Sequence, residues 1–465
     1  MKIQFCGGAQ TVTGSQFLLT INGSTILAEC GIYQGKRELA YERNQNFIFD
    51  PKTVDAVILT HAHMDHSGNL PNLVKKGFNK KIYATSPTVD LCKIMLRDAG
   101  HLQEKDIEWV NKIRAKQHKE PLQPYYTVAD AEACMDNFMP VEYEKTFTVA
   151  PGVDVRLHEA GHILGSAGIL LDINEKGRHM RFGITGDVGR ANMPILKDPN
   201  LLRELDGLII ESTYGNRLHG EYHDVEEEFV QAIRETVSSG GKVIIPAFAV
   251  GRTQHLVYIL HKLYNENRIP DVPIFVDSPL ASHATDVFRQ HPECFDRETN
   301  RTFVAIGQDP FSFPRLTYTK DATESKNLNT LKYPCIIISG SGMCEGGRIL
   351  HHLRNNIEDH KVLLLFVGYA AKDTLARKIM DGAEVVKIFG EEHKVKCKIK
   401  SVDSFSAHAD RRGLLDYISI TPPSKLKNIF LVHGELEQST PLKDALRSQG
   451  YENIHIPNIG ETINI

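Results

Sequence analysis

The sequence predicts an α/β protein in which one α/β domain interrupts another. Its 465 residues are too many for one ordinary core and suit two domains. The first 60 residues contain short strands, with a hairpin turn at Asn22-Gly23, and later strands run into a His or an Asp. From about residue 218 helices alternate with buried apolar runs, which is typical of a parallel, doubly wound sheet. We therefore expect an outer domain over 1–217 and 394–465 and an inserted domain over 218–393.

Composition places the chain among globular proteins. Hydrophobic residues make up 41% and charged residues 24%, and the net charge of −4 excludes a uniformly basic surface that coats a nucleic acid. The N-terminal segment does not resemble a signal peptide, and no stretch is apolar enough for a membrane helix. A cytoplasmic location and no membrane partner are the resulting expectations.

The eight cysteines are scattered without a CxxC pair. This spacing argues against a disulfide framework and against a thiolate zinc site. Any metal ion would therefore be held by histidines and carboxylates.

The segment His61-Ala62-His63-Met64-Asp65-His66 carries four potential metal ligands in six residues, directly after the apolar run VDAVILT. Two histidines two positions apart can serve one ion while the following Asp-His pair serves a neighbour. A single histidine would more often be structural, but four ligands at this spacing indicate a dinuclear metal site.

This HxHxDH pattern resembles the signature of the metallo-β-lactamase superfamily, and further elements follow in the same order. The resemblance implies an αββα sandwich and a complete ligand set for two zinc ions. It assigns one zinc to His61, His63 and His162, the other to Asp65, His66 and His433, and a bridging role to Asp187. Two ions held this way can supply a bridging hydroxide and stabilise both oxygens of an in-line displacement.

One position departs from the family pattern. Glu29, in LAECG, stands where an aspartate is usual and where the side chain supports a ligand without binding the metal. A glutamate can make the same hydrogen bonds to a ligand histidine only if the backbone withdraws by about one methylene. We therefore expect a modest change in metal affinity or geometry, not an inactive protein.

Four further segments resemble motifs of the β-CASP nucleases, the branch that includes the endonuclease of eukaryotic mRNA 3′-end cleavage and its bacterial and archaeal relatives. The resemblance covers essentially the whole chain and identifies 218–393 as the β-CASP insertion. The segments are Glu211–Gly215, Ile245–Arg252, Ser339–Met343 and Phe405–Asp410.

A histidine beside a carboxylate is a suitable proton donor for the alkoxide that leaves when a phosphodiester is cut. The resemblance assigns this general-acid role to His408, with Glu211 orienting the ring. The alternative is that His408 is a structural residue of a turn.

Ser339-Gly340-Ser341-Gly342 follows an apolar strand and precedes a helical stretch that we expect near Gly346. In that position backbone N–H groups can hold phosphate oxygens. Arg252 is a second candidate phosphate contact, although an internal role in helix capping or a salt bridge fits its position almost equally well. Seven other histidines of the insertion are predicted on polar helix faces or loops, and we exclude them from the site: His219, His223, His255, His261, His283, His351 and His352.

Together these features predict a zinc-dependent phosphodiesterase specific for single-stranded RNA. The resemblance implies products with 3′-hydroxyl and 5′-phosphate ends, and His433 favours RNA because the DNA-directed branch tends to have valine there. We expect endonuclease action, with 5′-to-3′ exonuclease activity left open, and a homodimer remains a possible assembly. The alternatives are a small-molecule hydrolase of the same superfamily and a non-catalytic RNA-processing subunit.

Overall fold

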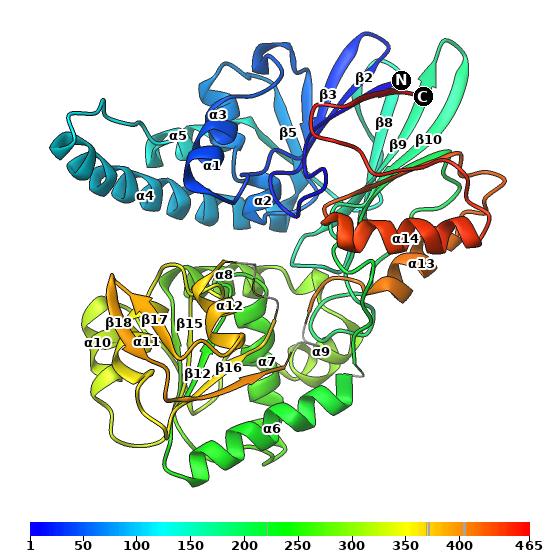
Figure 1. Ribbon diagram of the computed structural model, residues 1–465. Helices are drawn as coiled ribbons and strands as arrows, with labels where there is room; N and C mark the ends of the chain where they lie inside the picture. The colour runs from blue at the N-terminus through cyan, green and yellow to red at the C-terminus, as the bar shows by residue number, and fades with distance from the viewer. Residues whose placement is uncertain (221, 369, 371–372, 403–405) are drawn as a thin grey trace. The chain divides into compact units, whose positions relative to one another are not determined.

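The computed structural model describes residues 1–220, 222–368, 370, 373–402 and 406–465. The chain divides into two compact units (Figure 1): unit 1 comprises Met1–Leu218 and His408–Ile465, and unit 2 comprises His219–Ala407. The chain returns to unit 1 at His408, later than the predicted boundary at 394. Strand β19 (Lys398–Ser401) pairs with β16 (Leu363–Phe366) of the unit 2 sheet, so the chain leaves that unit only after β19.

Unit 1 contains two seven-stranded sheets. The strands of the first sheet are, in spatial order, β22 (Thr462–Asn464), β1 (Lys2–Gly7), β2 (Gln16–Ile21), β3 (Ser24–Ala28), β4 (Ala56–Ile58), β5 (Lys81–Thr85) and β6 (Phe138–Val141). Those of the second sheet are β21 (Ile454–His455), β20 (Asn428–Val432), β11 (Gly207–Glu211), β10 (Arg178–Ile184), β9 (Ala167–Glu175), β8 (Val153–Glu159) and β7 (Phe147–Ala150).

Apolar side chains from both sheets form one shared core. Phe5 of β1 packs against Phe17 of β2 and Phe430 of β20, with ring centroids 6.0 and 5.3 Å apart. Along β1 buried residues alternate with more exposed ones. Successive side chains of a strand point to opposite faces of its sheet, and only one face of the first sheet packs against the second sheet. The two sheets therefore form the inner layers of unit 1.

Helices cover the outer faces of both sheets. Beside the first sheet lie α1 (Arg37–Gln45), α2 (Met64–Ser67), α3 (Leu70–Lys75), α4 (Ser86–Lys116) and α5 (Val128–Cys134). Against the second sheet pack α13 (Arg411–Ser419) and α14 (Leu436–Ser448), whose buried faces include Leu414 and Leu442. Unit 1 is thus an αββα sandwich, as the sequence predicted.

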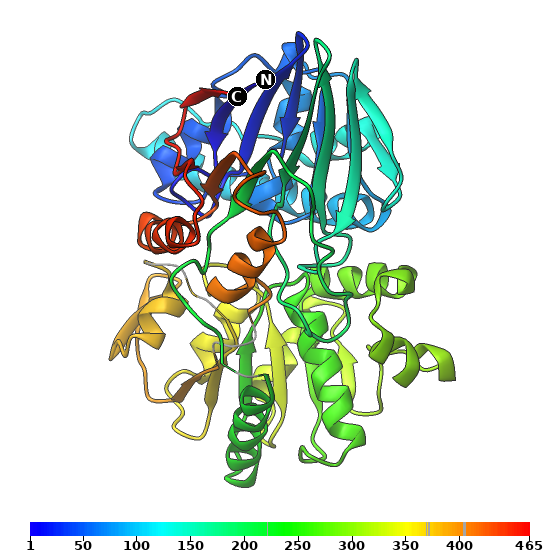
Figure 2. The same cartoon turned by 90° about the vertical axis from the view of Figure 1, so that its right-hand side faces the viewer.

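Unit 2 is built around a six-stranded parallel sheet (Figure 2). Its spatial order is β14 (Leu316–Tyr318), β13 (Ile274–Asp277), β15 (Ile336–Ser339), β12 (Val243–Pro246), β16 and β19, and a separate hairpin joins β17 (Val385–Ile388) to β18 (Glu391–Lys394). The helices are α6 (Tyr222–Ser238), α7 (Arg252–Asn265), α8 (Pro279–Gln290), α9 (Arg297–Thr302), α10 (Ala322–Thr330), α11 (Ile349–Asn356) and α12 (Leu375–Met380). The crossovers between non-consecutive strands confirm the predicted α/β insertion.

Two local predictions in unit 2 were wrong. The helix after the Gly-rich loop begins at Ile349 rather than near Gly346. His255, His261 and His352 are buried at 8%, 4% and 0% exposure, although their positions suggested polar faces. Each has a polar or aromatic partner, which explains how a histidine is accommodated inside; His261, for example, faces the carbonyl oxygen of Pro310 at 2.9 Å. Within the described residues, no helix is both long and apolar enough to span a bilayer.

Candidate active site and metal centre

The predicted site residues of unit 1 lie at one edge of the sandwich because their strands end there. Strands β10, β11 and β20 are mutually parallel, and Glu211 at the end of β11 is paired in register with Val432 at the end of β20. Asp187 follows β10, and His433 follows β20. Carboxyl ends of parallel strands meet at the same sheet edge, so three residues far apart in sequence become neighbours.

The other sheet delivers the HxHxDH segment to the same place. Strand β4 ends at Ile58, and the chain then turns into the one-turn helix α2, which carries Asp65 and His66. Gly186, next to Asp187, allows the two segments to come close together. It has φ +59°, and a Cβ there would lie 2.4 Å from the Oγ1 of Thr60. Glycine is the residue that tolerates both conditions.

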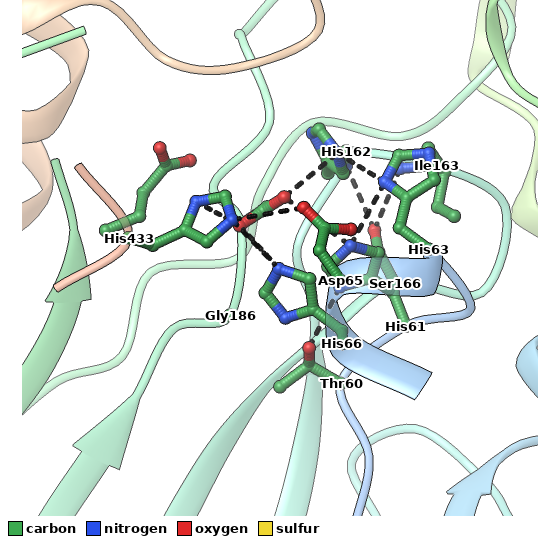
Figure 3. Close-up of polar contacts among 12 residues, drawn as sticks. Thr60, His61, His63, Asp65, His66, His162, Ile163, Ser166, Gly186 and His433 are labelled. Carbon is green, nitrogen blue, oxygen red and sulfur yellow. Dashed lines mark hydrogen bonds and ion pairs between the residues drawn. The ribbon is translucent and has the colours of Figure 1, made fainter. Parts of the chain in front are cut away.

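Four ligand-type atoms converge in the first cluster (Figure 3). The Nδ1 of His63 lies 3.2 Å from the Nε2 of His61 and 3.2 Å from the Nε2 of His162. The Oδ2 of Asp187 lies 3.5 Å from the first of these Nε2 atoms and 3.4 Å from the second. Ligand atoms on a tetrahedral zinc, with zinc–nitrogen bonds of about 2.0–2.1 Å, lie about 3.3 Å apart.

A second cluster adjoins the first and uses the other oxygen of the same carboxylate. The Nε2 atoms of His66 and His433 are 3.3 Å apart, and the latter lies 3.3 Å from the Oδ2 of Asp65. The Oδ1 of Asp187 lies 3.2 Å from the Nε2 of His66. One buried carboxylate thus presents one oxygen to each cluster, which is the arrangement of a bridging ligand.

Hydrogen bonding within the protein does not account for this packing. The Nδ1 of His63 faces the Nε2 atoms of both His61 and His162 at 3.2 Å, and a ring nitrogen, which carries either one proton or one lone pair, can form a good hydrogen bond with only one of them. Burial lowers the pKa of His61 to about 3 and that of His63 to about 4, so these imidazoles are neutral and carry lone pairs. Neutral nitrogens and carboxylates turned toward common points are the donor set that zinc requires, and the residues therefore fit a metal.

Carboxylates in the same cluster are held in their ionised form. Although burial alone would raise it, the pKa of Asp187 lies well below its usual value because His433, His66 and His408 surround it. Burial would also raise the pKa of Asp65, but the hydrogen bond to His433 and the nearby imidazole of His66 lower it. Ionised carboxylates are the state that binds a dication.

Glu29 occupies the supporting position that the sequence indicated. Its Oε2 lies 2.7 Å from the Nδ1 of His66, and its Oε1 accepts a hydrogen bond from the Thr60 backbone N–H at 2.8 Å. The residue is completely buried and has φ +64°, the left-handed conformation that a non-glycine residue seldom adopts. The longer side chain thus coincides with an unusual backbone conformation just after β3.

Three hydroxyl residues that the sequence reasoning missed also orient ligand histidines. The Oγ1 of Thr60 lies 2.9 Å from the Nδ1 of His61, and the Oγ1 of Thr213 lies 3.2 Å from the Nδ1 of His433. The backbone N–H of His162 donates to the Oγ of Ser166 at 3.0 Å. Thr60 directly precedes the HxHxDH segment and Thr213 lies within the Glu211–Gly215 motif, so position in sequence could have suggested both.

His408 and Glu211 are brought together beside the metal clusters. The Nδ1 of His408 lies 3.0 Å from the Oε1 of Glu211, and that oxygen also accepts the Val188 backbone N–H at 2.7 Å. The same ring nitrogen is 4.0 Å from the Oδ2 of Asp187. Burial lowers the pKa of His408, but the carboxylates of Glu211 and Asp187 outweigh it and raise the value to about 9.

The predicted phosphate-binding residues belong to unit 2. The Ser341 N–H donates to the Gly346 carbonyl at 3.2 Å and the Ser339 Oγ donates to the Asp277 carbonyl at 2.9 Å, so both groups have partners inside the protein. Gly340 and Gly342 lie between β15 and α11. Arg252 is the first residue of α7, and its guanidinium lies 3.1 Å from the Nδ1 of His255, which agrees with an internal role.

The fold and the site together define a metallo-hydrolase of the metallo-β-lactamase superfamily with a β-CASP insertion. Three family descriptions match consecutive parts of the chain: a metallo-beta-lactamase superfamily domain over residues 18–177, a Beta-Casp domain over 253–379, and a Zn-dependent metallo-hydrolase RNA specificity domain over 392–457.

Similar proteins identify the family. Ribonuclease TTHA0252 of Thermus thermophilus is 34% identical over 465 residues, which cover 100% of both chains. Transcription termination factor FttA of Methanocaldococcus jannaschii is 31% identical over 98% of this chain and 70% of its own length. The chain belongs to the β-CASP RNA nucleases, a family of metal-dependent ribonucleases.

A solved structure shows the same fold at low sequence identity. A protein of unknown function from Enterococcus faecalis V583 matches 99% of each chain with a TM-score of 0.57 and 14% identity. At that identity the likeness concerns the fold alone.

Proposed function

We propose that this protein is a two-zinc phosphodiesterase that cuts single-stranded RNA and leaves 3′-hydroxyl and 5′-phosphate ends. The observation that carries the proposal is the pair of clusters with ligand-atom separations of 3.2–3.5 Å, which share the two oxygens of Asp187. These separations match the edges of tetrahedral zinc sites, about 3.3 Å.

We assign the seven proposed ligand residues to the two ions as the family resemblance implied. His61, His63 and His162 would hold one zinc; Asp65, His66 and His433 would hold the other; Asp187 would bind both. Bound zinc would supply an activated water at neutral pH and neutralise charge on the phosphate. The protein fixes the ligands beforehand through Glu29, Thr60 and Thr213.

His408 would act on the leaving group. Its Nδ1 faces the Oε1 of Glu211 at 3.0 Å, and we assign to its Nε2 the transfer of a proton to the departing O3′ of the RNA. In the reaction a water molecule gives up one proton to solvent as its oxygen bonds to phosphorus, the P–O3′ bond breaks, O3′ takes the proton of His408, and His408 then regains a proton from solvent. In the metal-free protein the carboxylates of Glu211 and Asp187 raise the pKa of His408 to about 9, so the ring is protonated at neutral pH.

RNA is the proposed substrate because the matched C-terminal family description concerns RNA specificity and the full-length relative is named a ribonuclease. Endonuclease cleavage is the proposed main activity, with 5′-to-3′ trimming as a second mode. The Ser339–Gly342 loop and Arg252 stay as proposed backbone contacts, with the loop the stronger of the two because it lies at the carboxyl end of the parallel strand β15.

Metal analysis and matched substrates test the proposal. Active protein should contain close to two zinc equivalents per chain, lose activity on chelation, and cut end-labelled RNA internally while sparing DNA of the same sequence. One zinc or none in active protein would refute the dinuclear site. Preferential DNA cleavage, or turnover of a lactone or thioester without RNA cleavage, would refute the RNA assignment, and an intact two-zinc protein without any activity would point to a non-catalytic subunit.

A further inference from the structure

A cavity of about 490 Å³ lies in unit 1, outside the metal clusters. Its polar lining comes from three separate parts of the chain: Gln10 and Thr11 after β1, Tyr33 and Arg43 around α1, and Asn458 before β22. The volume lies within the range of small-ligand sites, about 300–1,000 Å³. Nothing in the proposed chemistry uses these residues.

The cavity has one cationic side chain and a fixed aromatic ring beneath it. The guanidinium carbon of Arg43 lies 4.4 Å from the centroid of the Tyr33 ring. Among the described residues that line the cavity, Arg43 is the only charged one, and no carboxylate of the described chain lies within ion-pair distance of it. An arginine stacked on a ring and without an ion-pair partner is available for an anionic ligand.

The wall that carries Tyr33 is rigidly built. Its backbone N–H donates to the Oδ1 of Asn44 at 2.8 Å, and its carbonyl accepts from the Nδ2 of the same residue at 2.9 Å. Asn44 is buried, and its own carbonyl accepts from the side chains of Asn69 and Asn72. These bonds fix the backbone at Tyr33 and at Asn44, the residue next to Arg43, so the ring on which Arg43 stacks has a fixed support.

The facing wall is also held by hydrogen bonds. The Nε2 of Gln10 donates to the Oδ1 of Asn458 at 2.9 Å. The Glu461 carboxylate accepts from the backbone N–H of Asn458 at 2.8 Å and from its Nδ2 at 3.1 Å. These contacts leave the Gln10 amide oxygen as an acceptor at the cavity wall.

Short links connect the cavity to the metal clusters. Gly8, two residues before Gln10, accepts a hydrogen bond from the backbone N–H of His433 at 2.7 Å. Ser15, at the other end of the same loop, donates its N–H to the carbonyl of Asp65 at 2.9 Å. The loop that forms one wall of the cavity is thus bonded at both ends to residues of the second metal cluster.

We propose that this cavity is a subsite for one nucleotide of the RNA strand, close to the cleaved bond, with Arg43 binding a backbone phosphate. Gln10 and Thr11 contact the sugar or base of that nucleotide. The inference rests on the proposed function, because it needs RNA in the metal site. A strand that places one phosphate at the metal clusters carries its neighbouring nucleotides past this loop, where the stacked guanidinium meets the next negative charge.

The first test compares Arg43→Ala with Arg178→Ala. Arg178 is also exposed and also lacks an ion pair within the described chain, but it is the first residue of β10 and is not part of the cavity lining. Arg43→Ala should raise the KM for a short RNA about 10-fold, with a smaller change in kcat, and should reduce the slope of log KM against log salt by about 0.7, the value for one phosphate contact on a single strand. Arg178→Ala should match the unmodified protein in KM, kcat and slope.

A substrate scan then identifies the contact. RNAs that carry one neutral methylphosphonate linkage are compared at each position around the cleaved bond. In the unmodified protein one position, within a few linkages of the cleavage site, should raise KM, and in Arg43→Ala that same position should have no further effect. Equal sensitivity of both proteins at every position would overturn the inference, as would an Arg43→Ala salt slope equal to that of Arg178→Ala.

Zinc content and RNA cleavage by the unmodified protein distinguish failure of the subsite proposal from failure of the proposed function. If the unmodified protein binds two zinc ions and cuts RNA while the scan shows no position that depends on Arg43, only the subsite is wrong. If the unmodified protein does not cut RNA, the proposed function itself is wrong.

Discussion

Each unit contains a buried polar cluster with histidine and carboxylate side chains, several of each in unit 1 but, among the described residues, only His352 and Asp277 in unit 2, and the clusters differ in how their hydrogen bonds are satisfied. In unit 2 the Asp277 carboxylate is fully buried and surrounded by donors. Its Oδ1 accepts from Arg348 at 2.7 Å and its Oδ2 faces the Nε2 of His352 at 2.6 Å, while the other ring nitrogen of that histidine faces Asn329 at 3.0 Å. Thr319 and Ser325 add further hydroxyl donors.

In unit 1 the histidines face one another. Nitrogen meets nitrogen at 3.2 Å for His61 and His63, and the Nδ1 of His162 is buried without a hydrogen-bond partner among the described residues. A buried polar cluster without matching donors and acceptors is costly unless a cation completes it. The match of donors to acceptors, and not the presence of histidine, therefore distinguishes a candidate metal site from a structural network.

The largest expected effect contrasts the central carboxylates of the two clusters. Asp187→Ala removes a ligand from both ions, so the protein should lose both zinc ions and RNA cleavage should fall by about 10⁴-fold or more, as when a whole catalytic unit is disabled. Zinc analysis and single-turnover cleavage measure this. Asp277→Asn is the matched control in the other cluster and should keep two zinc ions; zinc loss in that variant would remove the distinction between the clusters.

The second prediction separates proton transfer from metal binding within unit 1. His408→Ala should slow RNA cleavage by roughly 10² to 10⁴ while zinc content stays close to two, because the departing O3′ loses its proton donor. A nitrophenolate leaving group needs little protonation, so the variant should be much less impaired on such a phosphodiester. His433→Ala should lose one zinc and be impaired on both substrates. Zinc loss in His408→Ala, or equal impairment on both substrates, would show that His408 is a ligand or a structural residue.

The third prediction concerns the stability of the unit 2 network. Asp277→Asn should lower the free energy of unfolding by about 3–5 kcal/mol at pH 7, because it leaves Arg348 and His352 beside a neutral group. Burial favours the neutral acid, but hydrogen bonds from His352 and its neighbours hold the pKa of Asp277 well below its ordinary value.

The sign of its pH dependence follows from this lowered pKa. Stability from an acid with a lowered folded pKa is fully present above its unfolded pKa, about 3.9, and is lost as pH falls toward the folded value. Urea unfolding at several pH values should therefore show the gap between Asp277→Asn and the unmodified protein shrinking only below about pH 4. A gap that shrinks already between pH 7 and pH 5 would contradict the assignment to Asp277.

A smaller effect is expected at the supporting carboxylate of the metal site. Glu29→Ala should weaken zinc binding by about 10–100-fold, since His66 and the Thr60 N–H lose their acceptor. Competition with a zinc-binding dye measures the affinity. Glu29→Asp serves as the control: it keeps the charge but shortens the reach, so its affinity should lie between those of Glu29→Ala and the unmodified protein. Unchanged affinity in Glu29→Ala would show that this carboxylate does not support the metal.

The smallest expected effect is a shift in the pKa of His408 in the metal-free protein. Its value of about 9 depends on Glu211 and Asp187 acting against burial, so Glu211→Gln should lower it. NMR titration of the ring of His408 in chelated samples measures this shift. With the raised pKa, the charged ring is present below about pH 9 and is lost above it; in Glu211→Gln the loss should begin at lower pH. An unchanged titration midpoint would exclude Glu211 as the partner.

The sequence patterns determined the division into an outer and an inserted α/β domain and the ligand types, and the family resemblance implied the αββα sandwich. Four ligands within six residues at His61–His66 require only local chain geometry, because a strand followed by a short helix turns those side chains to one end. The family resemblance then supplied the distant members, and the positions of all nine proposed metal and proton-transfer residues could be written down without coordinates.

The tertiary structure decided what depends on strand pairing and on the interior. Register between β11 and β20 places Glu211 beside the end of β20, and no local pattern encodes a contact across 221 residues. Local periodicity also does not determine whether a polar residue is buried. His352 was therefore predicted on a polar face, although it is buried in the core and its Nε2 faces Asp277. Local spacing sets which side chains share a direction, whereas packing alone sets which of them lose water, and the loss of water determines their charge and their partners.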